Sequence, residues 1–341
     1  MTLLRFPVVL AVLLVLCSAN LNAKSRTLDI YFIDVEGGAA TLIVTPLGES
    51  LLVDSGFPGE RDPARIAHVA LDVAGLKQID HYITTHWHRD HVGGSARLAQ
   101  LMLIKHYYDH GLPTAAAADI PADLIEAYRQ TTQGRSTILR PLDEIKFKSK
   151  SLRVRVLAAN GIVAGEQPDA PQIRPCGSDF KPGPEDKTDN AKSIGFVLTF
   201  GRFKFFDGGD LTWNVEHKLV CPENLAGIVD VYQVDHHGMD SSNNPEFIRA
   251  LKPTVAIIDN GPRKAGEART FGTLKSQAEV QAIYQLHRNV LTTEKDNAPP
   301  DFVANDEEAC QGNFIKVSVD ANGDYSVSIP AKGISRSYRA R

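Results

Sequence analysis

One run of six residues, His86-Trp87-His88-Arg89-Asp90-His91, constrains the fold of this chain more than any other segment. It follows a strand-like run at 79–85 and precedes Val92-Gly93-Gly94, an order that predicts a strand, a ligand-bearing loop and then a helix. Because alternate residues at a strand end point the same way, we expect His86 and His88 to face one point. Asp90 and His91 then turn toward a second point. Imidazole and carboxylate ligands predict two adjacent divalent metal ions, with zinc the first choice and manganese or iron the next.

Two later segments offer side chains that would complete such a site. Asp210 follows two glycines that let the backbone approach an ion closely, so it is the natural bridging carboxylate, with a helix N-cap as the alternative. His236 and His237 follow a strand expected at 229–234. One of them should complete the second metal site, while the other can face the substrate as a proton donor or anion contact.

The run His86-x-His88-x-Asp90-His91 resembles the signature of the metallo-β-lactamase-fold hydrolases. Four further segments fit that family in order, at 32–40, 51–56, 205–211 and 232–238, and the resemblance extends from about residue 28 to residue 291. The chain looks most similar to the extracellular metallo-β-lactamase-like domain of DNA-uptake competence proteins. It is also similar to the phosphorylcholine esterases of cell surfaces, which share a His-His-Gly element. The resemblance implies an α/β fold, a four-layer αββα sandwich.

The same resemblance implies roles for individual residues. It implies His86 and His88 as ligands of the first metal, Asp90 and His91 as ligands of the second, Asp210 as the bridge, His237 as the remaining ligand, and His236 and Asp90 as the residues that carry catalysis. The reverse assignment of the two adjacent histidines stays open. The family's usual third histidine for the first metal is missing, and His110, Asp189 and Asn190 are the candidates to replace it. Asp54, at a strand end, is expected to orient a ligating histidine.

The first 23 residues have the pattern of a secretory signal peptide. Arg5 supplies the positive charge, residues 8–16 form an apolar run too short to span a bilayer comfortably, and Ala23 precedes a plausible cleavage point. Lipidation at Cys17 and an uncleaved anchor are the alternatives. We therefore expect an exported chain, periplasmic or secreted, with a metallo-β-lactamase-like domain at 24–331 and a disordered basic tail at 332–341. No later segment is expected to span a membrane.

Charge and cysteine content limit the partners and the disulfides. The net charge is −4, and −5 once Arg5 is removed, so no global field favours nucleic acid. Export leaves Cys176, Cys221 and Cys310, so at most one disulfide forms within the chain and one thiol stays odd. Oligomeric state has no signature in the sequence.

Periodicity predicts a strand pair near the N-terminus and later a succession of strands and helices. Helices are expected at 62–74, 92–103, 121–130, 212–219, 244–251 and 276–286. Short strands are expected at 290–291 and in a last hairpin at 313–319 and 325–329. The stretch 161–190 is rich in Pro, Gly and Asp without periodicity, and we interpret it as a flap beside the site. Strands that pair first and then alternate with helices, in two similar halves, fit two sheets packed face to face with helices outside.

Together these features predict an exported dinuclear metal-dependent hydrolase. Within that class we expect a phosphoesterase that acts on a phosphodiester or DNA-like substrate, either a small molecule or a polymer. Two alternatives remain: a lactone, ester or β-lactam amide hydrolase of the same fold, and a metal-binding relative without catalysis. A fold does not choose among such substrates, so the residues of the site must.

Overall fold

The computed structural model describes residues 27–113, 118–166 and 181–341. The predicted signal peptide and Cys176 lie outside these ranges, as does the middle of the stretch predicted as a flap. Cys221 is disulfide-bonded, and Cys310 is the free cysteine of the described ranges. In the same ranges no helix is long and apolar enough to cross a membrane.

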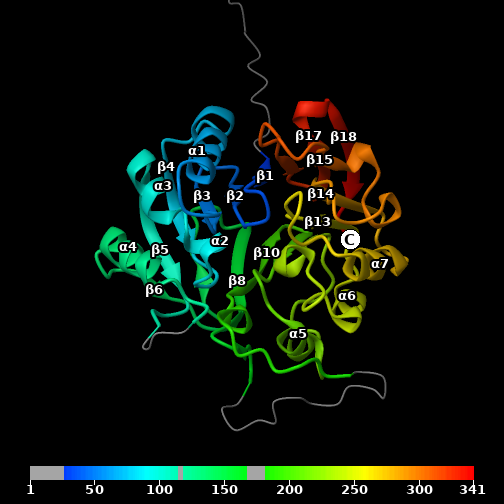
Figure 1. The fold of residues 1–341 in the computed structure, drawn as a ribbon, viewed down its shortest axis with the longest axis horizontal. Helices are drawn as coiled ribbons and strands as arrows, with labels where there is room; N and C mark the ends of the chain where they lie inside the picture. The colour runs from blue at the N-terminus through cyan, green and yellow to red at the C-terminus, as the bar shows by residue number, and fades with distance from the viewer. Residues whose placement is uncertain (1–26, 114–117, 167–180) are drawn as a thin grey trace, which may run out of the picture.

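Two β-sheets, each of nine strands within the described residues, form the centre of the molecule (Figure 1). The strands of the first sheet, in spatial order, are β18 (Ile334–Arg339), β17 (Asp324–Ile329), β16 (Ile315–Val319), β1 (Leu28–Phe32), β2 (Thr41–Val44), β3 (Ser50–Val53), β4 (Gln78–Ile83), β5 (Leu103–Asp109) and β6 (Thr137–Ile138). Those of the second sheet are β15 (Val303–Asn305), β14 (Ala282–His287), β13 (Val255–Ile258), β12 (Val231–Gln233), β11 (Phe203–Asp207), β10 (Gly195–Phe200), β8 (Leu152–Ala159) and β7 (Glu144–Ile145), with β9 (Ile162–Val163) paired to β8. Strands β3 to β6 run parallel to one another, as do strands β11 to β15. The other pairings, among them β2 with β3 and β10 with β11, are antiparallel.

Helices cover the outer faces of the sheets (Figure 1). On the side of the first sheet lie α1 (Arg61–His68), α2 (Arg89–Val92), α3 (Ser95–Leu101) and α4 (Ala122–Thr132), with a π-helical turn at Val69–Val73 after α1. On the side of the second sheet lie α5 (Trp213–Val220), α6 (Pro245–Leu251) and α7 (Ala268–Ser276). Within the described ranges, 3₁₀ turns have the bounds Asp189–Lys192, Asp235–Gly238, Glu294–Asp296, Pro300–Phe302 and Pro330–Lys332.

Successive side chains of a strand point to opposite faces of its sheet, so each strand contributes to two of the three core layers. In β1, Ile30 and Phe32 enter the core between the two sheets, whereas Tyr31 packs under the helices of the first sheet. In β11, Phe205 enters the same central core and Phe206 packs under the helices of the second sheet. The two sheets thus share one core with helices outside, which confirms the predicted four-layer αββα sandwich.

Two predicted elements after α7 are wrong. The segment 276–286, predicted as a helix, is the end of α7 followed by β14, because Tyr284 and Leu286 alternate into the central core. Its apolar residues fit a helical spacing as well, and pairing between β13 and β15 decides for a strand. Val290 and Leu291, predicted as a strand, lie in an exposed turn.

The disordered basic tail predicted at 332–341 is also wrong, because Ile334–Arg339 forms β18 at the edge of the first sheet. Tyr338 stacks on Tyr325 with ring centroids 5.4 Å apart, and the Arg336 guanidinium lies over the Phe302 ring at 4.1 Å. The charge count had suggested a solvated tail. Alternation instead places the basic side chains along an edge strand, where they also discourage pairing with another chain.

Candidate metal centre

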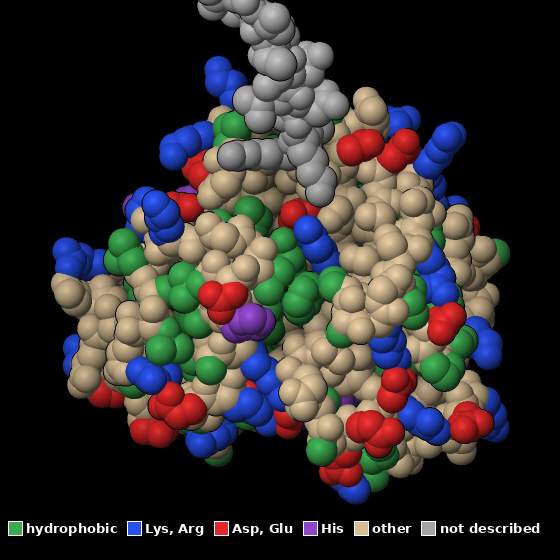
Figure 2. All heavy atoms as spheres, turned by 90° about the horizontal axis from the view of Figure 1, so that it is seen from above, with side chains coloured by type: hydrophobic (Ala, Val, Ile, Leu, Met, Phe, Trp, Pro, Cys, Tyr) green, Lys and Arg blue, Asp and Glu red, His purple; other side chains and the backbone are tan. Residues whose placement is uncertain are grey.

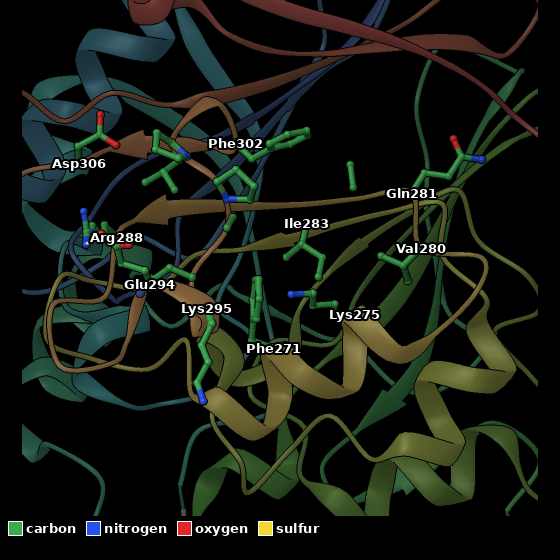
Figure 3. Close-up of a pocket in the computed structure, with 16 residues that line it drawn as sticks. Phe271, Lys275, Val280, Gln281, Ile283, Arg288, Glu294, Lys295, Phe302 and Asp306 are labelled. Atoms are coloured by element: carbon green, nitrogen blue, oxygen red, sulfur yellow. Dashed lines mark hydrogen bonds and ion pairs between the residues drawn. The ribbon is translucent and has the colours of Figure 1, made fainter.

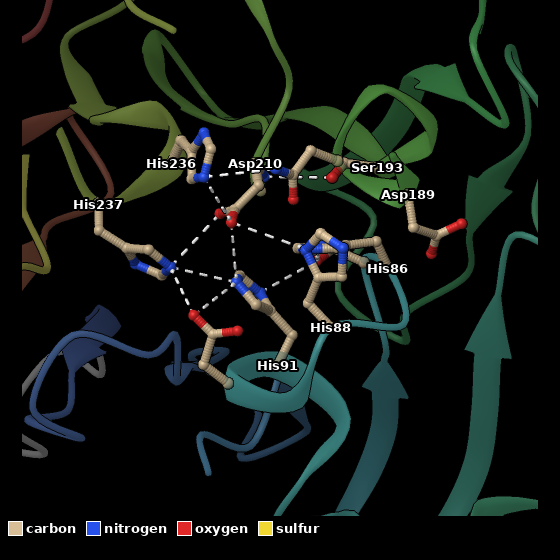
Figure 4. A network of polar contacts seen from close by, with 12 residues as sticks. His86, His88, His91, Asp189, Ser193, Asp210, His236 and His237 are labelled. Carbon is tan, nitrogen blue, oxygen red and sulfur yellow. Dashed lines mark hydrogen bonds and ion pairs between the residues drawn. The ribbon is translucent and has the colours of Figure 1, made fainter. Parts of the chain in front are cut away.

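Loops at the carboxyl ends of parallel strands carry the polar residues of the site. In chain order, the site residues and the strands they follow are Asp54 after β3, His86 to His91 after β4, His110 after β5, Asp210 after β11, His236 and His237 after β12, and Asp259 after β13. Carboxyl ends of neighbouring parallel strands meet at one edge of a sheet. Because the two sheets face each other, the loops of both edges converge on one region (Figure 4).

Two groups of ligand-type side chains lie there. The first ligand group is His86, His88 and Asp210, the second ligand group is Asp90, His91, Asp210 and His237, and within each group the ligand atoms lie within 4.8 Å of one another. Asp210 belongs to both groups. Its Oδ2 lies 3.7 Å from His86 Nε2 and 3.2 Å from His91 Nε2, and its Oδ1 lies 3.5 Å from His237 Nε2. The structure therefore brings all the residues predicted as ligands into two groups that share one carboxylate.

The donor atoms of these groups fit divalent cations. Within the described part of the chain, His86 Nε2 and Asp210 Oδ1 are buried and have no hydrogen-bond partner. Buried polar atoms are normally satisfied, so a coordinated ion would explain both the unpartnered imidazole nitrogen and the unpartnered carboxylate oxygen. Imidazole and carboxylate donors are the ligands that zinc takes in proteins, and manganese accepts them as well.

The charges of the region also favour a cation. Burial alone would lower the pKa of His91, but the carboxylates of Asp210 and Asp54 raise it well above its usual value. Burial alone would also lower the pKa of His237, but the Asp210 carboxylate raises it to about 9. Burial and the neighbouring His91 hold the pKa of His86 well below its usual value, so His86 stays neutral and able to coordinate. The carboxylates thus attract positive charge to the point where both ligand groups meet.

Two carboxylates lie behind ligating imidazoles, and the one beside His91 is hydrogen-bonded to it. Asp54 Oδ2 lies 2.7 Å from His91 Nδ1 and accepts a hydrogen bond from Thr85 Oγ1 at 2.6 Å. Asp259 Oδ1 lies 3.3 Å from His237 Nδ1. A carboxylate on the far nitrogen of a ligating histidine sets its tautomer and ring orientation. Asp54 therefore occupies the orienting position expected for it.

The backbone explains why the two adjacent histidines point in different directions. His236 and His237 both have left-handed dihedral angles, with φ of 55° and 54°, a conformation that costs roughly 1–3 kcal/mol at a non-glycine residue. Their ring centroids lie 6.3 Å apart. His237 is buried in the second ligand group, whereas His236 Nε2 faces Asp210 at 3.5 Å and its Nδ1 lies 3.1 Å from the hydroxyls of Ser241 and Ser242. This strained turn puts one imidazole among the ligands and the other at their rim.

The three candidates for a further ligand of the first group lie in different places. His110 Nε2 is 3.1 Å from Asp189 Oδ2, which also accepts a hydrogen bond from the Trp87 backbone at 2.7 Å. His110 and Asp189 are therefore paired with each other, and neither belongs to the first ligand group. Asn190 lies beside His236, with its Nδ2 3.4 Å from His236 Nε2. Among the described residues the buried Oδ1 atoms of Asn190 and Asp189 both have no hydrogen-bond partner, and Lys192 Nζ lies 3.3 Å from that of Asp189. Within these ranges Asn190 therefore keeps an uncharged oxygen without a cationic partner beside His236.

Three residues of the site were missed by the sequence analysis. Lys264 Nζ contacts Asp90 Oδ2, Asp119 Oδ2 lies 3.2 Å from His88 Nε2, and Asp259 supports a ligand of the second group. Each is a single charged residue in a loop. The position of Asp259 directly after the apolar run at 255–258 was the one signal that could have found it.

The chain matches a known protein family over part of its length. Residues 33–156 match the family described as the metallo-beta-lactamase superfamily, and this stretch holds His86, His88, Asp90 and His91. The matched stretch is a metallo-beta-lactamase superfamily domain. This domain and the two ligand groups support a metal-dependent hydrolase.

Individual proteins are similar to this chain over part of its length. ComE operon protein 3 of Bacillus subtilis (strain 168) is 28% identical over 199 residues, which make up 56% of this chain and 21% of that protein. This identity supports the resemblance to competence proteins. The chain spans about a fifth of the length of this curated relative. Igni18, a metallo hydrolase from Ignicoccus hospitalis, superposes with a TM-score of 0.43 at 12% identity, covering 75% of this chain and 94% of its own. CmlA, a diiron β-hydroxylase from Streptomyces venezuelae, gives a TM-score of 0.38 at 18% identity, covering 67% of this chain and 44% of its own.

A further polar cluster, formed by Asp34, His287 and Cys310, lies outside the two ligand groups. His287, at the end of β14, is fully buried, and its Nε2 lies 2.8 Å from Asp34 Oδ1. Asp34 Oδ2 accepts hydrogen bonds from Arg65 at 3.0 Å and from the Cys310 thiol at 3.1 Å. Because Arg65 already supplies the positive charge at this carboxylate, we interpret the cluster as a buried ion-pair network.

The ion pair predicts how stability depends on pH. Burial alone would lower the pKa of His287, but the hydrogen bond to Asp34 raises it to about 9. A raised folded pKa gives stability that is complete below the unfolded pKa of about 6.5 and is lost as the pH rises through about 9. Wild-type protein should therefore lose on the order of 2–3 kcal/mol of unfolding free energy between those pH values that His287→Gln does not lose. Denaturant titrations of both metal-loaded proteins from pH 5 to 9 measure this, and parallel curves would contradict it.

Proposed function

We propose that this protein is an exported phosphodiesterase that uses two divalent metal ions, zinc or manganese. In this proposal the first ion is held by His86, His88 and Asp210, and the second by Asp90, His91, Asp210 and His237. His236 contacts the substrate. Residues 1–23 serve as the signal peptide, as their charge and apolar pattern suggest.

The composition of the first ligand group carries the choice of substrate. Across the described ranges the group offers two imidazoles and one carboxylate, and His110 is held by Asp189 at 3.1 Å. Fewer nitrogen ligands leave more coordination positions for the substrate and favour manganese beside zinc. A phosphate suits such an open site because two of its oxygens can reach two ions, whereas acyl transfer needs one polarised carbonyl.

The residues around the ligands add to this preference. Bound divalent ions would lower the pKa of a coordinated water and offset charge on phosphoryl oxygens. Lys264 Nζ contacts Asp90 and donates to the Gly37 carbonyl at 2.6 Å, which fixes a positive charge beside the second ligand group. Such a charge favours an anionic substrate. His236, at the rim of the ligands, is placed to contact the departing oxygen.

The outer surface suggests that recognition is local. Figure 2 shows basic and acidic side chains interspersed around the rim of one face, with apolar side chains nearer its middle. With a net charge of −4, the protein does not draw a polyanion by its overall field. The resemblance to DNA-uptake competence domains favours a nucleic-acid phosphodiester, which the centre would contact through a few residues.

The experiment is a substrate panel with metal-loaded protein. We expect kcat/KM for bis(p-nitrophenyl) phosphate to exceed that for nitrocefin and for an N-acyl homoserine lactone by roughly tenfold or more, with manganese at least as effective as zinc. Asp90→Ala, which removes a carboxylate of the second ligand group, is the inactive control and should lose nearly all turnover.

Each other outcome of the panel assigns a different function. Robust β-lactam or lactone hydrolysis without phosphodiesterase activity under either metal would replace the proposal with an acyl hydrolase. Two bound metals with no turnover of any substrate would instead indicate a non-catalytic relative.

A further inference from the structure

A cavity of about 530 Å³ opens beside the metal centre on the side of His236. Residues between Lys181 and Asn190, the described end of the predicted flap, line it together with Trp213 and Arg269. His236 also lines it, and its Nε2 lies 3.5 Å from Asp210 Oδ2. One ester arm of a phosphodiester bound at the ligand groups would therefore extend into this cavity. Resting on the proposed function, we propose that the cavity is a subsite for a nucleobase on that ester arm.

Trp213 supplies a rigid planar surface in the wall of the cavity. Its Nε1 donates to the Lys181 carbonyl at 3.1 Å, and the Arg269 guanidinium lies over its ring at 5.1 Å. A Cβ on Gly183 would come within 3.2 Å of the Trp213 side chain, so a larger residue there would crowd the indole. Hydrogen bonds to Asn214 at 2.9 and 3.0 Å hold Gly183 in place. Aromatic rings and guanidinium planes are the surfaces on which nucleobases stack.

Asn190 supplies an unused polar atom at the inner end. Its side chain is 9% exposed, and within the described residues its Oδ1 has no hydrogen-bond partner. A buried acceptor without a donor costs free energy until a donor reaches it. The ring N–H or amino group at the edge of a base is such a donor. An ester arm with a planar face and a hydrogen-bonding edge therefore satisfies both Trp213 and Asn190.

The charges select against a cationic ester arm such as choline. Arg269 lies over the Trp213 ring, so a quaternary ammonium group would meet the positive guanidinium where it would otherwise contact the aromatic face. Lys181, Glu185, Asp186 and Asp240 also line the cavity, so its lining holds two basic and three acidic side chains besides His236. A neutral base can instead stack on the guanidinium plane without a charge penalty.

Binding can be measured without relying on turnover. The chain has two tryptophans, Trp87 in the loop that carries His86 and His88 and Trp213 in the cavity wall, so quenching that is lost in Trp213→Leu reports the cavity. Metal-loaded protein is titrated with thymidine 5′-monophosphate, phosphocholine and glucose 1-phosphate, which share the phosphate and differ in the arm. We expect saturable quenching by the nucleotide and binding roughly tenfold tighter than that of the other two.

Variants locate the binding. Calorimetry with Trp213→Leu should show nucleotide affinity reduced roughly tenfold or more. Phe302→Leu is the matched control, because Phe302 also lies under an arginine, with the Arg336 guanidinium at 4.1 Å. It lines a separate cavity of about 540 Å³ between α7 and the strands β14 and β15 (Figure 3), none of whose lining residues belongs to either ligand group. Nucleotide affinity should be unchanged in this control.

The outcomes separate this inference from the proposed function. Equal affinity for the three probes, tighter binding of phosphocholine or of the sugar phosphate, or unchanged nucleotide affinity in Trp213→Leu would each overturn the nucleobase subsite. Phosphodiester turnover accompanied by any of these results leaves the proposed function in place. Selective nucleotide binding without phosphodiester turnover supports the subsite and overturns the proposed function.

Discussion

Asp210→Ala is expected to reduce bound metal from two ions per chain to at most one and to lower phosphodiester kcat/KM by roughly 10³-fold or more. Among the described residues, Asp210 is the member common to both ligand groups. Its carboxylate faces His86, His91 and His237 at 3.7, 3.2 and 3.5 Å. Removing it therefore takes an oxygen donor from both ions and the negative charge that draws cations to the site. Elemental analysis of the purified variant and steady-state kinetics measure the two effects.

Asp207→Asn is the matched control for this experiment. Asp207 ends β11, three residues before Asp210, and burial raises its pKa to about 8. An amide has nearly the same shape, and its Oδ1 can still accept the hydrogen bond that the Gly209 N–H donates to Asp207 Oδ1 at 3.0 Å. Full metal content in Asp207→Asn with loss in Asp210→Ala separates ligation from damage to the strand end. Two ions retained by Asp210→Ala would contradict its bridging role.

The adjacent histidines should give opposite results. His237→Ala is expected to lose one metal ion, because His237 is buried in the second ligand group with its Nδ1 3.3 Å from Asp259. His236→Ala is expected to keep both ions and to lose roughly 10²-fold or more in kcat, because His236 lies at the rim, where it can contact the departing oxygen. Metal content and kcat of the two variants are the measurements. A His236→Ala protein that loses metal while His237→Ala keeps both ions would reverse the assignment.

The ligands could be predicted because their signals are local. His86, His88, Asp90 and His91 fall in one short loop after a recognisable strand, and a strand end sets which of them share a direction. Asp210 and the histidine pair also follow strands. Convergence of these loops then needs only two sheets that face each other, which the alternation of strands and helices indicates.

The supporting residues could not be predicted in the same way. Lys264, Asp119 and Asp259 are isolated charged residues, and their contacts with the ligands join positions far apart in the chain. Nothing in the immediate neighbourhood of Lys264 or Asp119 distinguishes them from surface charges, and Asp259 is marked only by its position directly after an apolar run at 255–258. The direction of the His236 ring has a similar origin, because it depends on two consecutive left-handed residues that spacing does not reveal.

The errors in the fold have one physical cause. In the segment 276–286 the apolar residues suit a helix as well as a strand, and burial between two neighbouring strands decides. In β18 the basic residues suggested a solvated tail, whereas pairing with β17 and the stacking of Tyr338 on Tyr325 hold the segment on the sheet. In both places tertiary contacts overrode a local pattern.

The most direct test of the dinuclear centre is a crystal of the protein grown with zinc or manganese and measured at the absorption edge of that metal. Two anomalous peaks are expected roughly 3.5–4 Å apart. Each should lie about 2.0–2.2 Å from its ligands, with Asp210 between them, His86 and His88 on one peak, and Asp90, His91 and His237 on the other. One peak, or two peaks that do not share Asp210, would contradict the dinuclear centre.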